Sequence, residues 1–174
     1  MSELFMVFDC ESVGLHGDTF AVGFVVVDRQ GTTHAEGCFY SPHYLAEGTK
    51  EGRDWVTQHV RIQGGISCLS VSAVREGFWK QWLHWKEQGA VLIADRAWPV
   101  EARFLAKCVD FPVMGLETRE FQGPFPLHEV ATARFLAGFD PLATVERLPD
   151  ELPAHDPLCD ARQSARLWLE AINR

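Results

Sequence analysis

The chain has 174 residues, of which 47% are hydrophobic and 23% are charged, and its formal net charge is −8. This length fits a single domain over residues 1–174 with one buried core, and the balance of apolar and charged residues argues against a disordered chain. The acidic charge argues against a protein that grips long duplexes through many phosphate groups, but local contact with nucleic acid bridged by metal ions stays open.

The sequence carries no sign of a membrane or secretory segment. It has no run of about 18 apolar residues without charge, and its N-terminus lacks a basic stretch followed by an apolar one. We therefore expect a cytoplasmic protein without membrane contact. The 5 cysteines include no C-x-x-C pair, and an odd number cannot all pair within one chain, so we expect neither a disulfide framework nor a structural zinc site.

The N-terminal part of the chain predicts an antiparallel meander of three strands. An apolar run that begins at Phe5 forms the first strand, and apolar, β-branched residues recur over residues 19–28. Arg29-Gln30-Gly31 is typical of a turn, so residues 32–40 are expected to return as a third strand. Residues 41–70 have no clear period, and we expect an ordered surface segment with at most a short helical turn over residues 55–60.

The C-terminal part predicts helices around a further strand. Ser72 is the expected N-cap of a helix over residues 73–88, whose apolar stripe packs on the core and which Gly89 ends. An apolar strand over residues 90–94 ends at Asp95, and Pro99 is expected to begin the next helix. The remaining predictions are a helix over 127–137, a loop over 140–153 and an amphipathic helix over 157–173, with 116–123 unassigned. This order of elements predicts an α/β fold with a mixed sheet.

Two carboxylates follow the first predicted strand. Asp9 and Glu11 are two residues apart, so on a strand their side chains point to the same face. Adjacent anions repel each other, and a divalent metal ion between them would remove the repulsion. A solvated acidic strand end has the same sequence pattern, so these two residues alone do not define a site.

Two further stretches carry candidate site residues. Asp95 ends a buried strand, and Glu101 follows in the next predicted helix. Because loops at the carboxyl ends of strands line the ligand crevice of α/β sheets, both residues are placed for chemistry. Helix capping by Asp95 and a favourable helix-dipole position for Glu101 explain the same pattern without chemistry. In His155-x4-Asp160, the aspartate can ligate a metal ion while the loop histidine takes a proton from water near neutral pH.

Taken together, these motifs resemble in residue type and order the DEDDh branch of the 3′–5′ exonuclease superfamily, whose members have a ribonuclease H-like fold. The likeness runs from Phe5 to about Trp168 and is weakest over residues 41–70. It implies a ribonuclease H-like mixed sheet, a three-strand antiparallel meander plus parallel strands, flanked by helices. The second motif of the family reads like His-Asn-x-x-Phe-Asp. The register of the following helix places Glu101 at the aspartate position of this motif, whereas counting from the strand end places Asp95 there, and both residues are kept as candidates.

The resemblance also implies a chemistry. Two Mg²⁺ or Mn²⁺ ions about 3.5–4 Å apart would serve hydrolysis, and such hard cations prefer oxygen ligands. Asp9 would bridge the ions, Glu11 and Asp160 would complete the shell of the first, and Glu101 (or Asp95) would hold the second through water. His155 would deprotonate the attacking water. The expected activity is hydrolysis of phosphodiester bonds at 3′ ends of single-stranded DNA or RNA, with release of nucleoside 5′-monophosphates.

Substrate contacts are less visible in the sequence. The candidate residues lie within or just after the first motif, or in the second, and they are Cys10, Ser12, Val13, Gly14, Leu15, His16 and Trp98. Ordinary packing is the favoured explanation for the same side chains. A catalytically silent ribonuclease H-like module that binds nucleic acid or a protein is the alternative function, and a polymerase proofreading subunit keeps the same chemistry. The choice of DNA or RNA and a homodimer both stay open.

Overall fold

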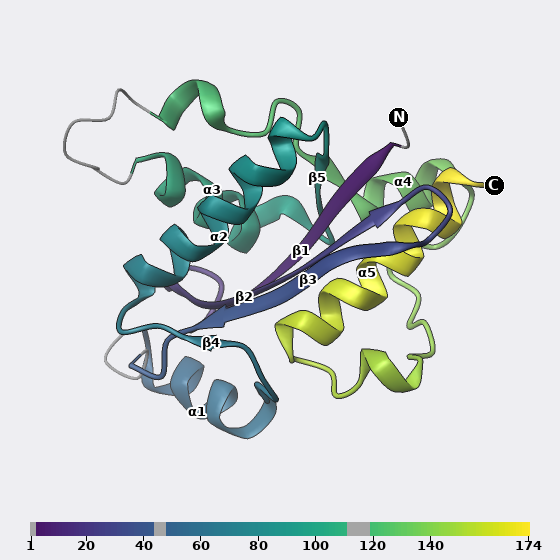
Figure 1. Cartoon of the computed structure of the whole chain (residues 1–174). Helices are drawn as coiled ribbons and strands as arrows, with labels where there is room; N and C mark the ends of the chain where they lie inside the picture. The colour runs from purple at the N-terminus through teal and green to yellow at the C-terminus, as the bar shows by residue number, and fades with distance from the viewer. Residues whose placement is uncertain (1–2, 44–47, 111–118) are drawn as a thin grey trace.

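A mixed β-sheet forms the centre of the computed structural model (Figure 1). The structure describes residues 3–43, 48–110 and 119–174, and within these ranges the sheet has six strands in the order β4-β3-β2-β1-β5-β6. The strands are β1 (Leu4–Ser12), β2 (Thr19–Asp28), β3 (Thr33–Tyr40), β4 (Ile66–Ser67), β5 (Val91–Ala94) and β6 (His128–Glu129). β1, β2 and β3 pair antiparallel and β5 joins β1 in parallel, so the predicted α/β class with a mixed sheet is confirmed.

Helices cover both faces of this sheet (Figure 1). The α-helices of the described ranges are α1 (Lys50–His59), α2 (Val71–Glu87), α3 (Ala102–Val109), α4 (Val130–Leu136) and α5 (Pro157–Ile172). Short turns of other helical types are η2 (Ala97–Glu101), η3 (Arg119–Gln122) and η4 (Pro149–Glu151). α2 and α3 pack on one face, and α4 and α5 on the other. In the described ranges, no helix combines the length and apolarity needed to cross a lipid bilayer.

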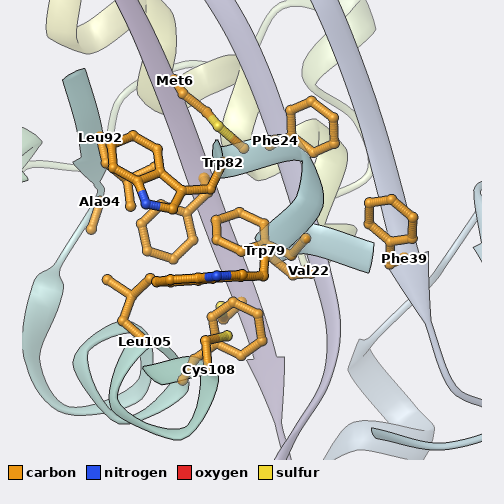
Figure 2. Packing of buried hydrophobic residues seen from close by; sticks show 14 of the residues in the cluster. Met6, Val22, Phe24, Phe39, Trp79, Trp82, Leu92, Ala94, Leu105 and Cys108 are labelled. Atoms are coloured by element: carbon orange, nitrogen blue, oxygen red, sulfur yellow. The ribbon is translucent and has the colours of Figure 1, made fainter. Parts of the chain in front are cut away.

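The side chains of β1 alternate between two cores. Met6 (Figure 2) and Phe8 point to the α2 face, and the ring of Phe8 lies 5.1 Å from that of Phe78. Phe5 and Val7 point to the α5 face. Full burial of a side chain of this size stabilises the fold by roughly 1.5–3 kcal/mol. Because the period of two continues along the strand, the next odd-numbered residues, which are the acidic ones, turn to the α5 face.

Several element boundaries differ from the sequence prediction. The N-cap of α2 is Ser70 and not Ser72, because the extended Ser70 places its hydroxyl to accept from the N–H of Ala73 at 3.2 Å. Pro99 does not begin α3: the residue before a proline is driven out of the helical region, Trp98 is extended, and α3 starts at Ala102. The start of the predicted 127–137 helix pairs with β5 as β6. Residues 116–118 of the unassigned stretch lie outside the described ranges.

α1 was expected to be no more than a short turn and is a ten-residue helix. The hydroxyl of Thr49 caps it by accepting from the N–H of Gly52, and Val56 is buried beneath it. A Cβ on Gly52 would lie 3.2 Å from a methyl carbon of Val13. Glycine lowers helix propensity, so the sequence pattern was weak, but its small size lets α1 pack closely on the end of β1.

Gly23 lets α5 approach the sheet. It pairs with Asp9 across β1 and β2, and a Cβ at this position would lie 2.2 Å from the carbonyl carbon and oxygen of Pro157. Pro157 is the first residue of α5, so the contact fixes how closely the start of that helix meets β2. The fold therefore requires a residue without a side chain at the centre of the sheet.

We expect Gly23→Ala to lower the free energy of unfolding by about 1–3 kcal/mol or more, because α5 must shift away from β2 to make room for the methyl group. Urea unfolding measures the change. Gly64→Ala is the matched control, since a Cβ there has no atom of the described chain within 4 Å. Equal stability of the two variants would contradict the close approach of α5.

Candidate metal centre

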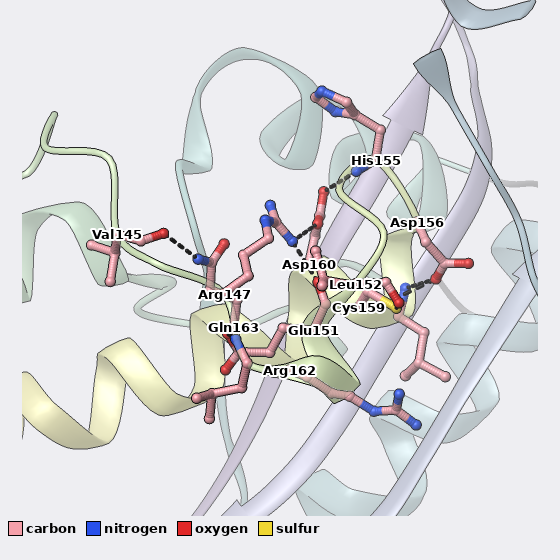
Figure 3. Close-up of polar contacts among 12 residues, drawn as sticks. Val145, Arg147, Glu151, Leu152, His155, Asp156, Cys159, Asp160, Arg162 and Gln163 are labelled. Atoms are coloured by element: carbon pink, nitrogen blue, oxygen red, sulfur yellow. Dashed lines mark hydrogen bonds and ion pairs between the residues drawn. The ribbon is translucent and has the colours of Figure 1, made fainter. Parts of the chain in front are cut away.

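Glu11, His155 and Asp160 converge where β1 ends against the start of α5. Each offers one ligand atom, and these atoms lie within 4.8 Å of one another. Nδ1 of His155 is 3.9 Å from Oε1 of Glu11, and the backbone N–H of His155 donates to Oδ2 of Asp160 at 3.1 Å (Figure 3). The fold thus brings three of the sequence-predicted residues together from the first strand, the last helix and the turn before that helix.

Asp9 lies within the field of the other acidic candidates. Burial, and then repulsion from Asp160, Glu101, Glu11 and Asp95, holds the pKa of Asp9 well above its ordinary value. Burial raises the pKa of Glu11 to about 8, and repulsion from Asp160 and Glu101 adds to the effect. Carboxylates that raise one another's pKa in this way would be stabilised by a divalent cation bound between them.

Glu101 reaches the end of β1. The pairing of β1 with β5 stops at Phe8, so the strand continues beyond β5. There the carboxylate of Glu101 accepts a hydrogen bond from the backbone N–H of Cys10, which lies between the two acidic residues of the first motif. Burial raises the pKa of Glu101 to about 7 despite this hydrogen bond. Glu101 is therefore in direct contact with the strand that carries Asp9 and Glu11.

Asp95 lies against α5. Its carboxylate accepts a hydrogen bond from the hydroxyl of Ser164, and Arg96 and Arg147 are the nearby cations that act on it. Burial still raises its pKa. Among the acidic neighbours that raise the pKa of Asp9, Asp95 has the weakest effect. The acidic neighbours that raise the pKa of Glu11 are Asp160, Glu101 and Asp156.

The turn that carries His155 is held by the segment after α1. The carbonyl of His155 accepts from the N–H of Arg61 at 3.1 Å. The buried carboxylate of Asp156 accepts from the N–H groups of Leu158 and Cys159 as the N-cap of α5, and from the N–H of Gln63 at 2.8 Å. His155 itself has φ 61°, a left-handed conformation that is uncommon for a residue other than glycine. The histidine is thus presented in one fixed backbone geometry.

Trp55 of α1 supports the imidazole. Its ring meets that of His155 edge-on, with centroids 5.0 Å apart, and stacks on His59 at 4.9 Å. The carbonyl of Trp55 also lies 2.8 Å from Nδ1 of His59. Because 42% of Trp55 remains exposed, the aromatic group is open to solvent beside the acidic cluster.

With this geometry in hand, comparison with known proteins assigns no family. No protein-family model matches the chain, and no curated protein matches it. The chemistry of the site is therefore inferred from its own residues.

The predicted substrate-binding residues divide into buried and exposed groups. The thiol of Cys10 packs in the core beneath α2, and Val13 is buried under α1. The hydroxyl of Ser12 donates to the carbonyl of Gly14 at 2.8 Å. The exposed group includes Leu15 and lines, together with His16, a cavity of about 640 Å³ between the end of β1 and the start of α1.

Trp98 belongs to the exposed group as well. It projects 75% exposed from η2, between Asp95 and Glu101.

Three residues around the cluster were not predicted from the sequence. Asp156 precedes Pro157, a pairing typical of an N-cap followed by a first helical residue, and that signal was present. Glu129 ends β6 beside Ala94, the last residue of β5, and its carboxylate accepts from the N–H of Ala97 at 2.9 Å. Arg147 contacts Asp160 from a stretch expected to be loop, and no local pattern marks it.

Proposed function

We propose that this protein is a metal-dependent 3′–5′ exonuclease of the DEDDh type, with a ribonuclease H-like fold. The observation that carries the proposal is the convergence of buried carboxylates with His155 where β1 meets α5. Hydrolysis of a phosphodiester requires positive charge at the phosphate and a base for the attacking water. The carboxylates of the cluster offer a binding place for that positive charge, and His155 offers the base.

The residues fit a hard divalent cation such as Mg²⁺ or Mn²⁺. These ions prefer carboxylate oxygens, and the carboxylates here repel one another in a buried setting. When bound, two such ions activate water, neutralise charge on the phosphate and stabilise the leaving 3′ oxygen. Asp9, Glu11 and Asp160 would hold one ion, and Asp9 would share the second with an acid of the second motif.

For that second acid we choose Glu101 over Asp95. Glu101 accepts a hydrogen bond from Cys10, between the two acids of β1, and it raises the pKa of Glu11. Asp95 is instead turned toward Ser164 of α5 and toward arginines.

His155 takes the proton from the attacking water. Its imidazole is 44% exposed, lies beside Glu11 and is supported by Trp55, so water has access to a ring held in place. The end of a single strand would enter past Leu15, His16 and Trp98, whose exposed side chains suit stacking on unpaired bases. The 3′–5′ polarity rests on the resemblance of the three motifs to the DEDDh family.

Incubation with 5′-labelled single-stranded DNA and RNA tests the proposal. With Mg²⁺ or Mn²⁺ we expect a ladder that shortens from the 3′ end, and with EDTA we expect intact substrate. Asp9→Asn should remove the activity, whereas Asp54→Asn, on exposed α1 and paired with Lys50, should not. In the same assay Glu101→Gln should lose more activity than Asp95→Asn. Intact substrate in the presence of either metal would contradict the proposed function.

A further inference from the structure

Arg147 binds an acidic residue of the proposed metal centre. Its Nη1 lies 2.5 Å from Oδ1 of Asp160, and the same nitrogen donates to the carbonyl of Glu151 at 2.9 Å (Figure 3). The other oxygen of Asp160 faces His155. The two carboxylate oxygens of Asp160 thus have different partners, Arg147 on one and the backbone N–H of His155 on the other, and Asp160 also offers one ligand atom to the cluster with Glu11 and His155.

The segment that carries Arg147 is fastened to α5 at several points. The carboxylate of Glu151 is buried, with 2% of the residue exposed, and binds Arg166 through both oxygens at 2.6 and 2.8 Å. Side chains of α5 also bind the backbone of this segment: Gln163 at Val145, Arg166 at Glu146 and Arg162 at Asp150. Arg147 is therefore presented to Asp160 from a fixed support, and only 22% of its side chain is exposed.

The simpler alternative is that the ion pair of Arg147 with Asp160 only fastens the segment that carries Arg147 to α5. Arg162 and Arg166 already fasten it, and their carboxylate partners, Glu36 and Glu151, lie outside the acidic cluster. The partner of Arg147 is instead an acid whose field raises the pKa of Asp9 and Glu11. The charge of Arg147 therefore acts on the cluster itself.

We propose that Arg147 is a positioning residue that orients Asp160 toward the cluster and limits the affinity of the cluster for divalent cations. This inference rests on the proposed function, because it concerns the same site. A guanidinium on one oxygen of Asp160 and the backbone N–H of His155 on the other hold the carboxylate in one rotamer, from which it offers a ligand atom to the cluster. The positive charge of Arg147 repels any cation that binds in the cluster. Between neighbouring charges that are largely shielded from water, this repulsion lowers the affinity for the cation about tenfold or more.

Titration calorimetry with Mn²⁺ alone tests the inference on the full chain. Arg147→Gln keeps a hydrogen-bond donor for Asp160 but removes the charge, so Mn²⁺ affinity should rise about tenfold. Arg147→Lys keeps the charge and should stay within about twofold of the wild type. Arg162→Gln is the control for a loosened segment, because it removes an anchor without touching Asp160. Its Mn²⁺ affinity should not rise.

The outcomes separate this inference from the proposed function. Unchanged or weaker Mn²⁺ binding by a folded Arg147→Gln protein would overturn the inference, as would an equal rise in Arg162→Gln. If the wild type binds Mn²⁺ but degrades no nucleic acid, the proposed function fails and the Arg147→Gln titration still decides the role of Arg147. If neither protein binds Mn²⁺, both are overturned.

Discussion

Glu11→Gln is expected to abolish nuclease activity and at the same time to stabilise the metal-free protein. Glu11 is buried at the end of β1, and burial together with repulsion from Asp160 and Glu101 raises its pKa to about 8. In the absence of metal, an ionised Glu11 therefore opposes folding. A neutral amide of the same shape removes that opposition and also removes a metal ligand.

The stability of the wild type should accordingly depend on pH. The pKa of Glu11 rises from 4.5 when unfolded to about 8 when folded, so its favourable contribution is complete below about pH 4.5 and is lost as the pH rises toward 8. Glu101, raised to about 7, acts in the same direction. Metal-free wild type should lose several kcal/mol of unfolding free energy between pH 5 and 8, and Glu11→Gln should flatten this slope.

Urea unfolding in EDTA at about pH 5.5 and pH 8 measures both effects. Mg²⁺ at about 100 times its dissociation constant should restore about 2.7 kcal/mol to the wild type at pH 8. Glu87→Gln, which removes an exposed carboxylate at the end of α2, is the control and should leave the pH slope unchanged. A Glu11→Gln protein that is less stable than the wild type in EDTA at pH 8 would show that Glu11 is a structural hydrogen-bond partner instead.

The face of the sheet to which each side chain of β1 points can be predicted from the sequence, because it depends only on the two-residue period of a strand. Phe5 and Val7 point to α5, and the same alternation places Asp9 and Glu11 on that face. The terminal helix was predictable for a similar reason, since Pro157 marks its start and its apolar residues recur with helical spacing. Where one short-range rule decides an element, the sequence is sufficient.

The second motif was harder because two local rules conflict there. Asp95 obeys the rule that acids at strand ends line the ligand crevice, whereas Glu101 obeys the helix register. Pro99 holds Trp98 extended and delays α3 to Ala102, so neither count along the chain gives the direction of either side chain. The choice required the contact of Glu101 with the N–H of Cys10, on the part of β1 that extends beyond its pairing with β5.

Residues that support the site through tertiary contact gave no signal of their own. Arg147 stands in a stretch without helical or strand period, and its partner Asp160 is 13 positions away. Trp55 lies on α1, whose glycine weakens the local helical pattern, and meets His155 from the other end of the chain. Such contacts depend on how α1 and α5 pack at the end of β1, which no spacing within either segment encodes.

His155→Ala is expected to lower the turnover number by about 10²- to 10⁴-fold while Mn²⁺ affinity stays near that of the wild type. The histidine has two roles open to it in this geometry, since its ring nitrogen lies close enough to Glu11 and Asp160 to ligate a metal ion with them. If His155 is only the base that takes a proton from water, its removal leaves metal binding intact. If His155 is a metal ligand, its removal lowers the metal affinity as well. Single-turnover cleavage and Mn²⁺ calorimetry on the same protein therefore distinguish the two roles.

His84→Ala is the matched control, because His84 is exposed on α2 and contacts Gln88 far from the cluster in sequence and on the opposite face of the sheet. It should change neither turnover nor Mn²⁺ affinity. Trp55→Leu should reproduce part of the turnover loss of His155→Ala, because the imidazole then loses the ring that holds it beside Glu11. A parallel loss of Mn²⁺ affinity and turnover in His155→Ala would make His155 a metal ligand and leave the base to be found elsewhere.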